Sequence, residues 1–190
     1  MWHTHKNMQE FRYELKVPKD RVAVLIGKDG EVKKRLEEET KTKLEIDSKE
    51  GDVFVLGNDA IGLYTAREII RAIGRGFNPD IAQLLLKPDY VFEIVDVRDY
   101  AGKSQESALR LKGRVIGKEG KSRRLIEELS ESYVSVYGKT ISIISTVQYA
   151  LIAKQAVESL LKGSTHANVY KFLEKKRREI KRKEVLGEND

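Results

Sequence analysis

LIGKDG at residues 25–30 and VIGKEG at residues 115–120 are the two stretches that decide the fold of this 190-residue chain. Each is an aliphatic pair followed by a Gly-x-x-Gly turn that carries a lysine. The second turn begins 90 residues after the first. Glycines let the backbone approach a phosphate closely, because no Cβ stands in the way. One such turn is a weak signal, but two at matching positions indicate a duplicated unit.

The sequence around both turns follows the same order of strands and helices. In the first unit, alternating or short apolar runs predict strands at 10–17, 44–46 and 53–56, and helical periodicity predicts helices at 22–26, 31–40 and 59–75. In the second unit the corresponding strands are 91–97, 133–137 and 140–144, and the helices are 121–131 and 147–162, with 101–111 a loop running into a helix. The pattern predicts an α+β fold, β-α-α-β-β-α in each unit, with helices packed on a three-stranded antiparallel sheet.

Composition shifts divide the chain into five segments. Asn78-Pro79 and Pro88 bracket a short apolar helix between the units. We therefore expect a disordered N-terminus at 1–9 and a first domain at 10–76. A linker helix at 77–88 then leads to a second domain at 89–163, and a basic C-terminal helix with its tail occupies 164–190.

Residue usage excludes several classes of site. The chain has no cysteine, so it has neither disulfides nor thiolate metal sites, and a reducing, cytoplasmic location is expected. No run approaches the roughly 18 apolar residues of a membrane helix. The three histidines form no ligand set. We expect no metal, no cofactor and no membrane association.

Positive charge is concentrated in particular places. The whole chain carries +6, and residues 164–190 hold eight basic and five acidic residues. Around the first turn, residues 22–34 have a net charge of +1, whereas residues 112–124 around the second turn have +5. A polyanionic partner is indicated, with the second turn contributing more to affinity. The basic C-terminal segment could lie along an RNA backbone or be a solvated terminal helix.

The two turns and their flanks resemble the KH family of type I order, in which such a loop clamps single-stranded nucleic acid. The resemblance implies a groove floored by aliphatic side chains, here Ile26, Leu36, Leu44 and Ile46 in the first unit and Ile116, Ile126, Val134 and Val136 in the second. One departure concerns the third residue after the second glycine. KH domains usually have an aliphatic residue there, but this chain has Lys33 and Arg123.

The second unit narrows the resemblance. GRVIGKEGKSR at 113–123, followed by YGKT at 137–140, is similar to archaeal ribosome-assembly KH proteins of the Partner-of-NOB or Dim-two family. This resemblance implies binding of single-stranded RNA near the 3′ end of small-subunit rRNA, assisting a PIN-domain endonuclease. The implied RNA-binding residues are Ile26, Gly27, Lys28, Asp29, Gly30 and Lys34 in the first unit, and Arg114, Ile116, Gly117, Lys118, Glu119, Gly120, Lys121, Arg123 and Arg124 in the second. Asp29 and Glu119 are expected to point to solvent, because an acid facing phosphate would weaken binding.

Other function classes compete with this interpretation. The chain could be a protein-interaction scaffold that docks a nuclease or a translation factor, and the nearly neutral first unit favours that role for residues 1–76. It could also be an RNA-degradation cofactor. An enzyme is disfavoured, because no Gly-x-x-x-x-Gly-Lys-Ser/Thr motif is present and neither turn follows a strand.

Overall fold

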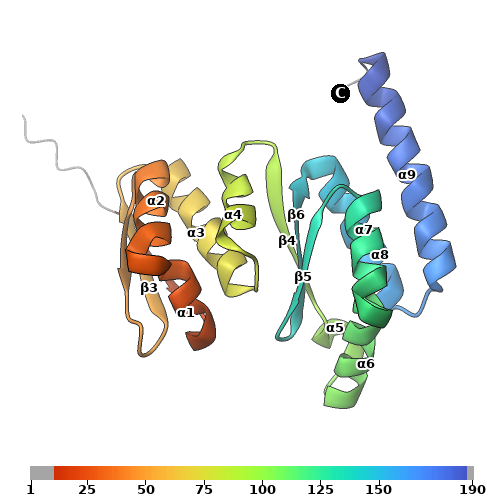
Figure 1. Cartoon of the computed structure of the whole chain (residues 1–190), viewed down its shortest axis with the longest axis horizontal. Helices are drawn as coiled ribbons and strands as arrows, with labels where there is room; N and C mark the ends of the chain where they lie inside the picture. The colour runs from red at the N-terminus through yellow and green to blue at the C-terminus, as the bar shows by residue number, and fades with distance from the viewer. Residues whose placement is uncertain (1–10, 188–190) are drawn as a thin grey trace, which may run out of the picture. The chain divides into compact units, whose positions relative to one another are not determined.

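The computed structural model describes residues 11–187, which form two compact units: unit 1 extends to Leu86 and unit 2 begins at Lys87. Each unit contains a three-stranded antiparallel sheet with helices on one face (Figure 1), so the expected α+β class and the two-fold repeat are confirmed. The segment expected to be disordered, 1–9, lies outside the described residues.

Unit 1 follows the predicted order, with its strands arranged β1-β3-β2. Its elements are β1 (Phe11–Lys16), α1 (Lys19–Ile26), the 3-10 turn η1 (Lys28–Gly30), α2 (Glu31–Thr40), β2 (Lys43–Ile46), β3 (Asp52–Gly57) and α3 (Ala60–Gly74). Leu44 lies opposite Val55 across the β2–β3 pair, and both side chains are buried. These inward residues and the apolar stripe of α3 form the core, because alternate strand residues share one face of the sheet.

The segment expected as a linker forms two short helices, α4 (Pro79–Ala82) and the 3-10 helix η2 (Gln83–Leu86). Both contact α3, so they are part of unit 1. The Asn78 side chain accepts a hydrogen bond from the Asp80 amide, and Pro79 occupies the first helical position, where its missing N–H costs nothing.

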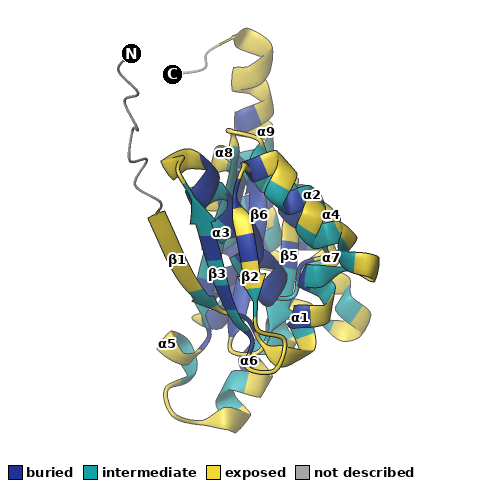
Figure 2. Cartoon of the chain, turned by 90° about the vertical axis from the view of Figure 1, so that its left-hand side faces the viewer, coloured by how far each residue is buried: buried dark blue, intermediate teal, exposed yellow. Residues whose placement is uncertain are grey.

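One feature of β1 differs from the prediction of a half-buried strand. Phe11 and Tyr13 are 51% and 43% exposed, although they share a face with the buried Val17. Figure 2 shows β1 exposed over most of its length at the edge of the sheet. The alternation identified the strand correctly, but the sequence does not show that the helices leave its N-terminal end uncovered.

Unit 2 repeats the arrangement, with strands in the order β4-β6-β5. Its elements are β4 (Tyr90–Asp96), α5 (Arg98–Ala101), α6 (Gln105–Ile116), the 3-10 turn η3 (Lys118–Gly120), α7 (Lys121–Leu129), β5 (Tyr133–Tyr137), β6 (Thr140–Thr146) and α8 (Val147–Leu161). The region expected to run from loop into helix at 101–111 is helical from Gln105 onward. Ser104 sets this start, because its hydroxyl accepts a hydrogen bond from the Ser107 amide.

The C-terminal helix α9 (His166–Leu186) is an integral part of unit 2. Val169, Leu173 and Ile180 lie in the same hydrophobic cluster as the β6 residue Ile143. α9 contacts both α8 and α7, and its first turn is capped by Thr165. The helix is therefore held along much of its length, although its last residues, including Val185, are exposed.

Each unit contains the same polar contacts between the helix that follows its glycine loop and its edge strand, which are α2 and β2 in unit 1 and α7 and β5 in unit 2. Glu37 accepts a hydrogen bond from the Leu44 amide, and Glu127, 90 residues later, accepts one from the Val134 amide. Behind them, the hydroxyl pair Thr40–Thr42 is matched by the pair Ser130–Ser132, each at 2.7 Å. The duplication therefore extends to the buried polar bonds that fix the edge strand against the helix.

Candidate nucleic-acid interface

The two Gly-x-x-Gly loops have nearly identical backbones. Gly27 and Gly117 have φ/ψ of 74°/176° and 72°/176°, a region open essentially only to glycine. The second glycines, Gly30 and Gly120, lie in the left-handed helical region. So does the acidic residue before each of them. Three of the four loop residues, all but the lysine, thus have positive φ and reverse the chain between two helices in both units.

The first glycine of each loop is also required by packing. A Cβ on Gly117 would lie 2.6 Å from the Ser122 Cβ and 2.8 Å from the Ser122 amide nitrogen. A Cβ on Gly27 would lie 2.5 Å from the Val32 Cγ2. The loop therefore passes directly over the first turn of the following helix, and any side chain at the first glycine would push the two apart.

The helices after the loops begin without a side-chain cap. Gly30 and Gly120 occupy the N-cap positions of α2 and α7 and provide no side-chain cap. The first amide of each helix, that of Glu31 or Lys121, donates to the carbonyl of Lys28 or Lys118, which leaves the following first-turn amides uncapped. By contrast, Asp59 caps α3 and Thr165 caps α9. Uncapped amides at a helix N-terminus carry partial positive charge and bind anions. Each loop thus presents backbone donors suited to a phosphate.

Three of the six basic residues near the second loop bond to the protein itself. Lys112 donates to the Gly138 carbonyl, and Arg114 donates to the carbonyls of Leu160 and Ser164. Arg123 pairs with Glu127 at 3.9 Å and its Nη1 lies 3.5 Å from the Val134 carbonyl oxygen. The local charge of +5 therefore overstates the number of cations free to meet a ligand.

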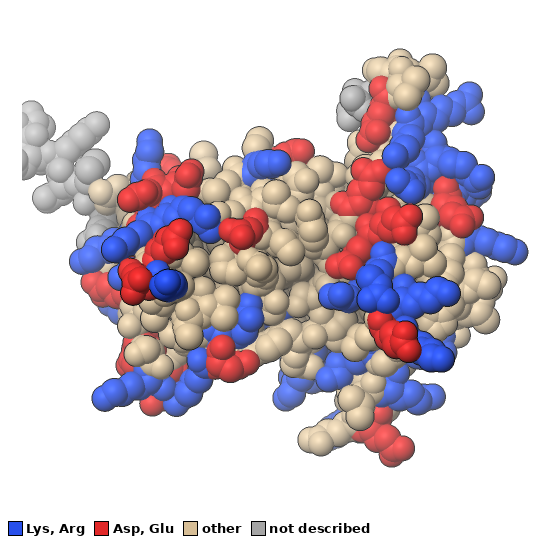
Figure 3. Space-filling model, viewed as in Figure 1, with Lys and Arg blue, Asp and Glu red and all other residues tan. Residues whose placement is uncertain are grey.

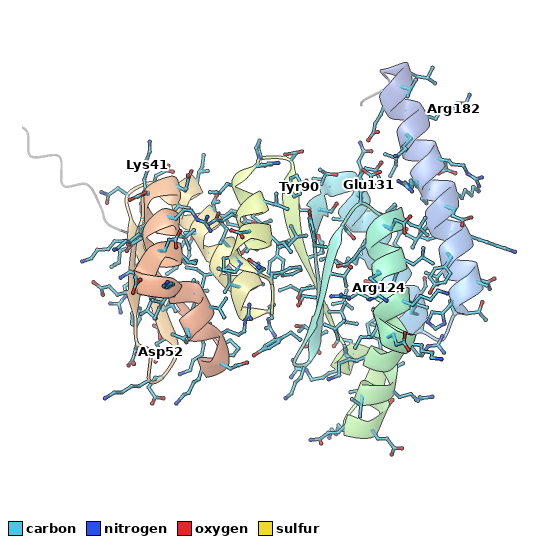
Figure 4. All side chains as sticks on the ribbon, viewed as in Figure 1. Lys41, Asp52, Tyr90, Arg124, Glu131 and Arg182 are labelled. Atoms are coloured by element: carbon cyan, nitrogen blue, oxygen red, sulfur yellow. The ribbon has the colours of Figure 1, made fainter. Side chains whose placement is uncertain are left out.

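The other three basic residues of this loop, Lys118, Lys121 and Arg124, are exposed. Their side chains have no ion pair or hydrogen bond to any residue in 11–187. The Arg124 Nη1 would lie 3.6 Å from a Cβ on Gly120, so its guanidinium sits beside the second glycine. Figure 4 shows Arg124 projecting from α7, and Figure 3 shows basic side chains gathered over α7. These three cations surround the uncapped end of α7.

The first loop is electrically balanced by comparison. Lys28 and Lys34 are exposed, but Arg35 pairs with Asp80 at 3.0 Å and Lys33 pairs with Glu37 at 3.9 Å. A shallow hollow beside the loop is lined by three basic and three acidic side chains: Lys28, Asp29, Glu31, Lys34, Arg35 and Glu38. Asp29 and its counterpart Glu119 are both exposed, in keeping with the expectation that they point to solvent.

The predicted aliphatic floor needs correction. Four of the eight proposed floor residues are almost completely buried core residues and offer no surface to a base: Leu36, Leu44, Ile126 and Val134. The other four are at least partly exposed: Ile26, Ile46, Ile116 and Val136. Single-residue periodicity identifies an inward face but cannot distinguish its buried centre from its accessible margin.

Two contributions to the site are absent from the sequence prediction. Glu37 and Glu127 hold Lys33 and Arg123, the residues that replace the usual aliphatic one, so these cations lie along the helix toward the edge strand. The i, i+4 spacing of Lys33 and Glu37, and of Arg123 and Glu127, could have predicted these ion pairs from the sequence. Ser122, under Gly117, is 3% exposed, and its hydroxyl has no hydrogen-bond partner among the described residues. No sequence signal marks that feature.

Within residues 11–187 no group of three or more acidic or histidine side chains could hold a metal ion. A helix long and apolar enough to cross a membrane is likewise absent from this part of the chain.

Comparison with protein families gives two matches. A model described as a KH domain matches residues 12–72, and one described as a eukaryotic type KH domain, type I, matches residues 91–178. KH domain-containing protein MJ0443 of Methanocaldococcus jannaschii is 56% identical over 172 residues, covering 88% of this chain and 75% of that protein. Pre-rRNA-processing protein pno1 of Aspergillus fumigatus is 35% identical over 121 residues, which is 62% of this chain but only 47% of that protein.

Solved structures agree with these matches. Dim2p from Pyrococcus horikoshii superposes with a TM-score of 0.81 at 44% identity, covering 87% of this chain and 99% of that one. The protein in the a/eIF2alpha–aDim2p–rRNA complex of the same organism gives a TM-score of 0.83 at 42% identity, covering 90% and 96%. The chain therefore belongs to the family of two-KH-domain proteins that includes archaeal Dim2p and eukaryotic PNO1.

Proposed function

We propose that this protein is a non-catalytic RNA-binding protein of small-subunit rRNA processing, which holds single-stranded RNA from the 3′ region of that rRNA. One observation carries the proposal: the uncapped N-terminus of α7 meets three exposed cations, Lys118, Lys121 and Arg124, at a glycine loop. The relatives of the chain support RNA as the ligand, since they include a pre-rRNA-processing protein and the aDim2p of a complex with rRNA.

In the proposed mode, the backbone of the RNA crosses the second loop. The first-turn amides of α7 that follow Lys121 donate to one phosphate, and Lys118 neutralises it or its neighbour. Lys121 and Arg124 follow the next phosphates along α7. Bases then lie toward β5, against the partly exposed Ile116 and Val136, with the Arg123 guanidinium at the margin.

Arg114 has a different role in this proposal. Its Nε and Nη2 donate to two backbone carbonyls, so we assign it to positioning α6 and the loop rather than to phosphate. The first loop contributes a second, weaker contact through Gly27, Gly30, Lys28 and Lys34. We further propose that the RNA-bound protein acts in the cytoplasm beside a PIN-domain endonuclease or other small-subunit assembly proteins.

A charge reversal in the second loop tests the proposal. The double variant Lys118→Asp, Glu119→Asp places two acids over the α7 N-terminus, and titration with RNA from the 3′ end of small-subunit rRNA is expected to show loss of most binding. The matched control is Lys28→Asp in the first loop, where Asp29 already provides the second acid, and there a much smaller loss is expected. Unchanged affinity in the second-loop variant would sink the assignment.

A scrambled RNA of equal length completes that experiment. Sequence-selective binding to the natural strand supports a role at one rRNA site. Equal binding of both RNAs that disappears with added salt would reduce the interaction to general charge attraction.

A second candidate function is protein docking by unit 1. Two observations favour it: the balanced charges around the first loop, and a solved complex whose name places a/eIF2alpha with aDim2p and rRNA. Binding of purified a/eIF2alpha to this chain after nuclease treatment would support docking. Binding that disappears with the RNA would count against it.

A further inference from the structure

The C-terminal helix α9 carries a second charged surface. Lys171, Lys175, Arg178 and Arg182 are all exposed and follow the spacing i, i+4, i+7, i+11. At 3.6 residues per turn, these four side chains fall within about 60° of arc and extend over about 16 Å. We call them the α9 stripe. Basic side chains along α9 are visible in Figure 3, and Figure 4 labels Arg182 near the C-terminal end of the helix.

The stripe lies on the side of α9 that faces away from the protein. Val169, Leu173 and Ile180, which are buried in the unit 2 core, are about 180° away around the helix. Because these three anchors hold α9 against α7 and α8, the stripe is a preformed row of cations rather than a flexible tail.

The basic side chains of α9 differ in their partners according to which side of the helix they occupy. Arg177 and Lys181, which lie nearer the protein, pair with Glu131 at the end of α7, at 3.5 and 3.1 Å. Lys171, Arg178 and Arg182 have no ion pair to any residue in 11–187. Lys175 lies 4.0 Å from Glu179, a surface pair of little strength. Arg177 and Lys181 are therefore paired within unit 2, while the four cations of the stripe remain available to a polyanion.

The composition of the stripe indicates which polyanion fits it. Single-strand binding surfaces combine positive charge with aromatic rings on which bases stack. The stripe has no aromatic residue, because Tyr170 and Phe172 pack against the core instead. Protein interfaces need an apolar centre, and apolar side chains appear only past the end of the stripe, at Val185 and Leu186. A straight row of cations without stacking groups suits the phosphate backbone of duplex RNA, which is recognised through shape and phosphates.

We propose that the α9 stripe binds the backbone of an RNA duplex adjoining the single strand held at the second Gly-x-x-Gly loop. Unit 2 thereby recognises a junction between single-stranded and double-stranded RNA rather than a strand alone. This inference rests on the proposed RNA binding by unit 2 and adds the structural context of the RNA that it binds.

The test compares three RNAs: a single strand from the 3′ end of small-subunit rRNA, that strand joined at either end to a hairpin duplex, and the hairpin alone. The stripe variant Lys171→Gln, Lys175→Gln, Arg178→Gln, Arg182→Gln removes four charges and keeps helix-forming residues. Its matched control removes four exposed lysines elsewhere: Lys49, Lys103, Lys139 and Lys162, each to Gln. Thermal unfolding checks that both variants fold.

The unmodified protein is expected to bind the hairpin-joined strand more tightly than the strand alone. The stripe variant should lose this advantage, by at least about tenfold at low salt, and the slope of log affinity against log salt should fall by about three. It should keep its affinity for the single strand, and the control variant should keep both affinities.

The loop variant Lys118→Asp, Glu119→Asp separates this inference from the proposed function. It should lose the single strand but retain salt-dependent binding of the hairpin through α9. Retention by the stripe variant of the full advantage for joined RNA would overturn the inference. So would an equal loss for joined and single-stranded RNA, or a stripe variant that loses only an acidic protein partner.

Discussion

The guanidinium of Arg114 donates a hydrogen bond from Nη2 to the carbonyl oxygen of Ser164, at 2.6 Å. In unit 1 the Nη2 of Arg21 donates to the carbonyl of Phe77, also at 2.6 Å. The two carbonyls are equivalent, since each follows the closing helix of its unit. The arginines are not, because Arg21 lies six residues before the first glycine of its loop and Arg114 lies three before its own. In both units an arginine of the helix before the loop therefore bonds to the segment after the closing helix, but the arginine comes from a different turn of that helix in each unit.

Arg114→Met is therefore expected to lower stability with little change in the salt dependence of RNA binding. Charge-assisted hydrogen bonds to two carbonyls are lost, at a cost of about 2 kcal/mol. Arg124→Met, at an exposed site beside Gly120, should leave unfolding unchanged and flatten the salt dependence instead. Urea unfolding and RNA titration of both variants check this. The opposite outcome, a stable Arg114 variant with reduced salt dependence, would make Arg114 a phosphate ligand.

Much of the fold was predictable because its signals are local. The glycine turns, the alternation at 10–17 and the periodicity of α2 and α3 lie within short windows, and each element occurs close to its predicted bounds. The start of α6 was less accessible. It lies in a segment without a counterpart in unit 1, so the repeat gave no guide there, and only the Ser104 cap marked it.

The candidate site was predictable in its backbone and less so in its side chains. The count of charges near the second loop predicted that both Lys118 and Arg114 bind RNA. In the structure the Lys118 side chain is exposed, whereas Arg114 donates to the carbonyls of Leu160 and Ser164. Those carbonyls are 46 and 50 residues away in the sequence. Hydrogen bonds between residues so far apart in the sequence depend on how the helices pack, and neither motif spacing nor composition specifies that packing.

The two glycines of the second loop should respond differently to substitution. Gly117→Ala forces a residue into a glycine-only backbone region and against Ser122, so a loss of about 3 kcal/mol is expected together with loss of RNA binding. Gly120→Asn should cost less than about 1 kcal/mol, because asparagine tolerates the left-handed conformation and a Cβ there would make only ordinary contact with the Arg124 guanidinium, at 3.6 Å. Chemical unfolding of the two variants provides the comparison. Equal losses would show that conformation at the two positions matters less than the geometry indicates.

Glu127 is expected to act through its hydrogen bond to β5 more than through its charge. Glu127→Leu leaves the Val134 amide without its acceptor at 2.8 Å, and a loss of about 1–3 kcal/mol is expected. Glu127→Gln keeps an acceptor oxygen and loses only the 3.9 Å pair with Arg123, at a cost below about 1 kcal/mol. Unfolding measurements and hydrogen exchange at the Val134 amide separate the two effects. If the glutamine variant were as unstable as the leucine variant, the ion pair with Arg123 would be the main contribution of Glu127 to stability.

Stability at high pH should depend on Lys154 and Glu93, which join α8 to β4. The Lys154 ammonium donates to Glu93 at 2.7 Å, and this bond together with the nearby acidic charges raises the pKa of Lys154 above its ordinary value of 10.5.

Because the folded-state pKa of Lys154 is the higher one, the stabilisation is complete below the unfolded pKa and is lost as pH rises through the folded value. Burial also raises the pKa of Tyr100 and Tyr149, which adds loss in the same direction. The charge of Lys154 also lowers the pKa of Tyr100, so the comparison is made with Tyr100→Phe in both proteins, and the double variant Glu93→Gln, Lys154→Met then isolates the pair. Unfolding free energies at about pH 9 and about pH 11 should fall more steeply for the protein that keeps Glu93 and Lys154. Parallel declines would show that the pair contributes nothing to folding in this range.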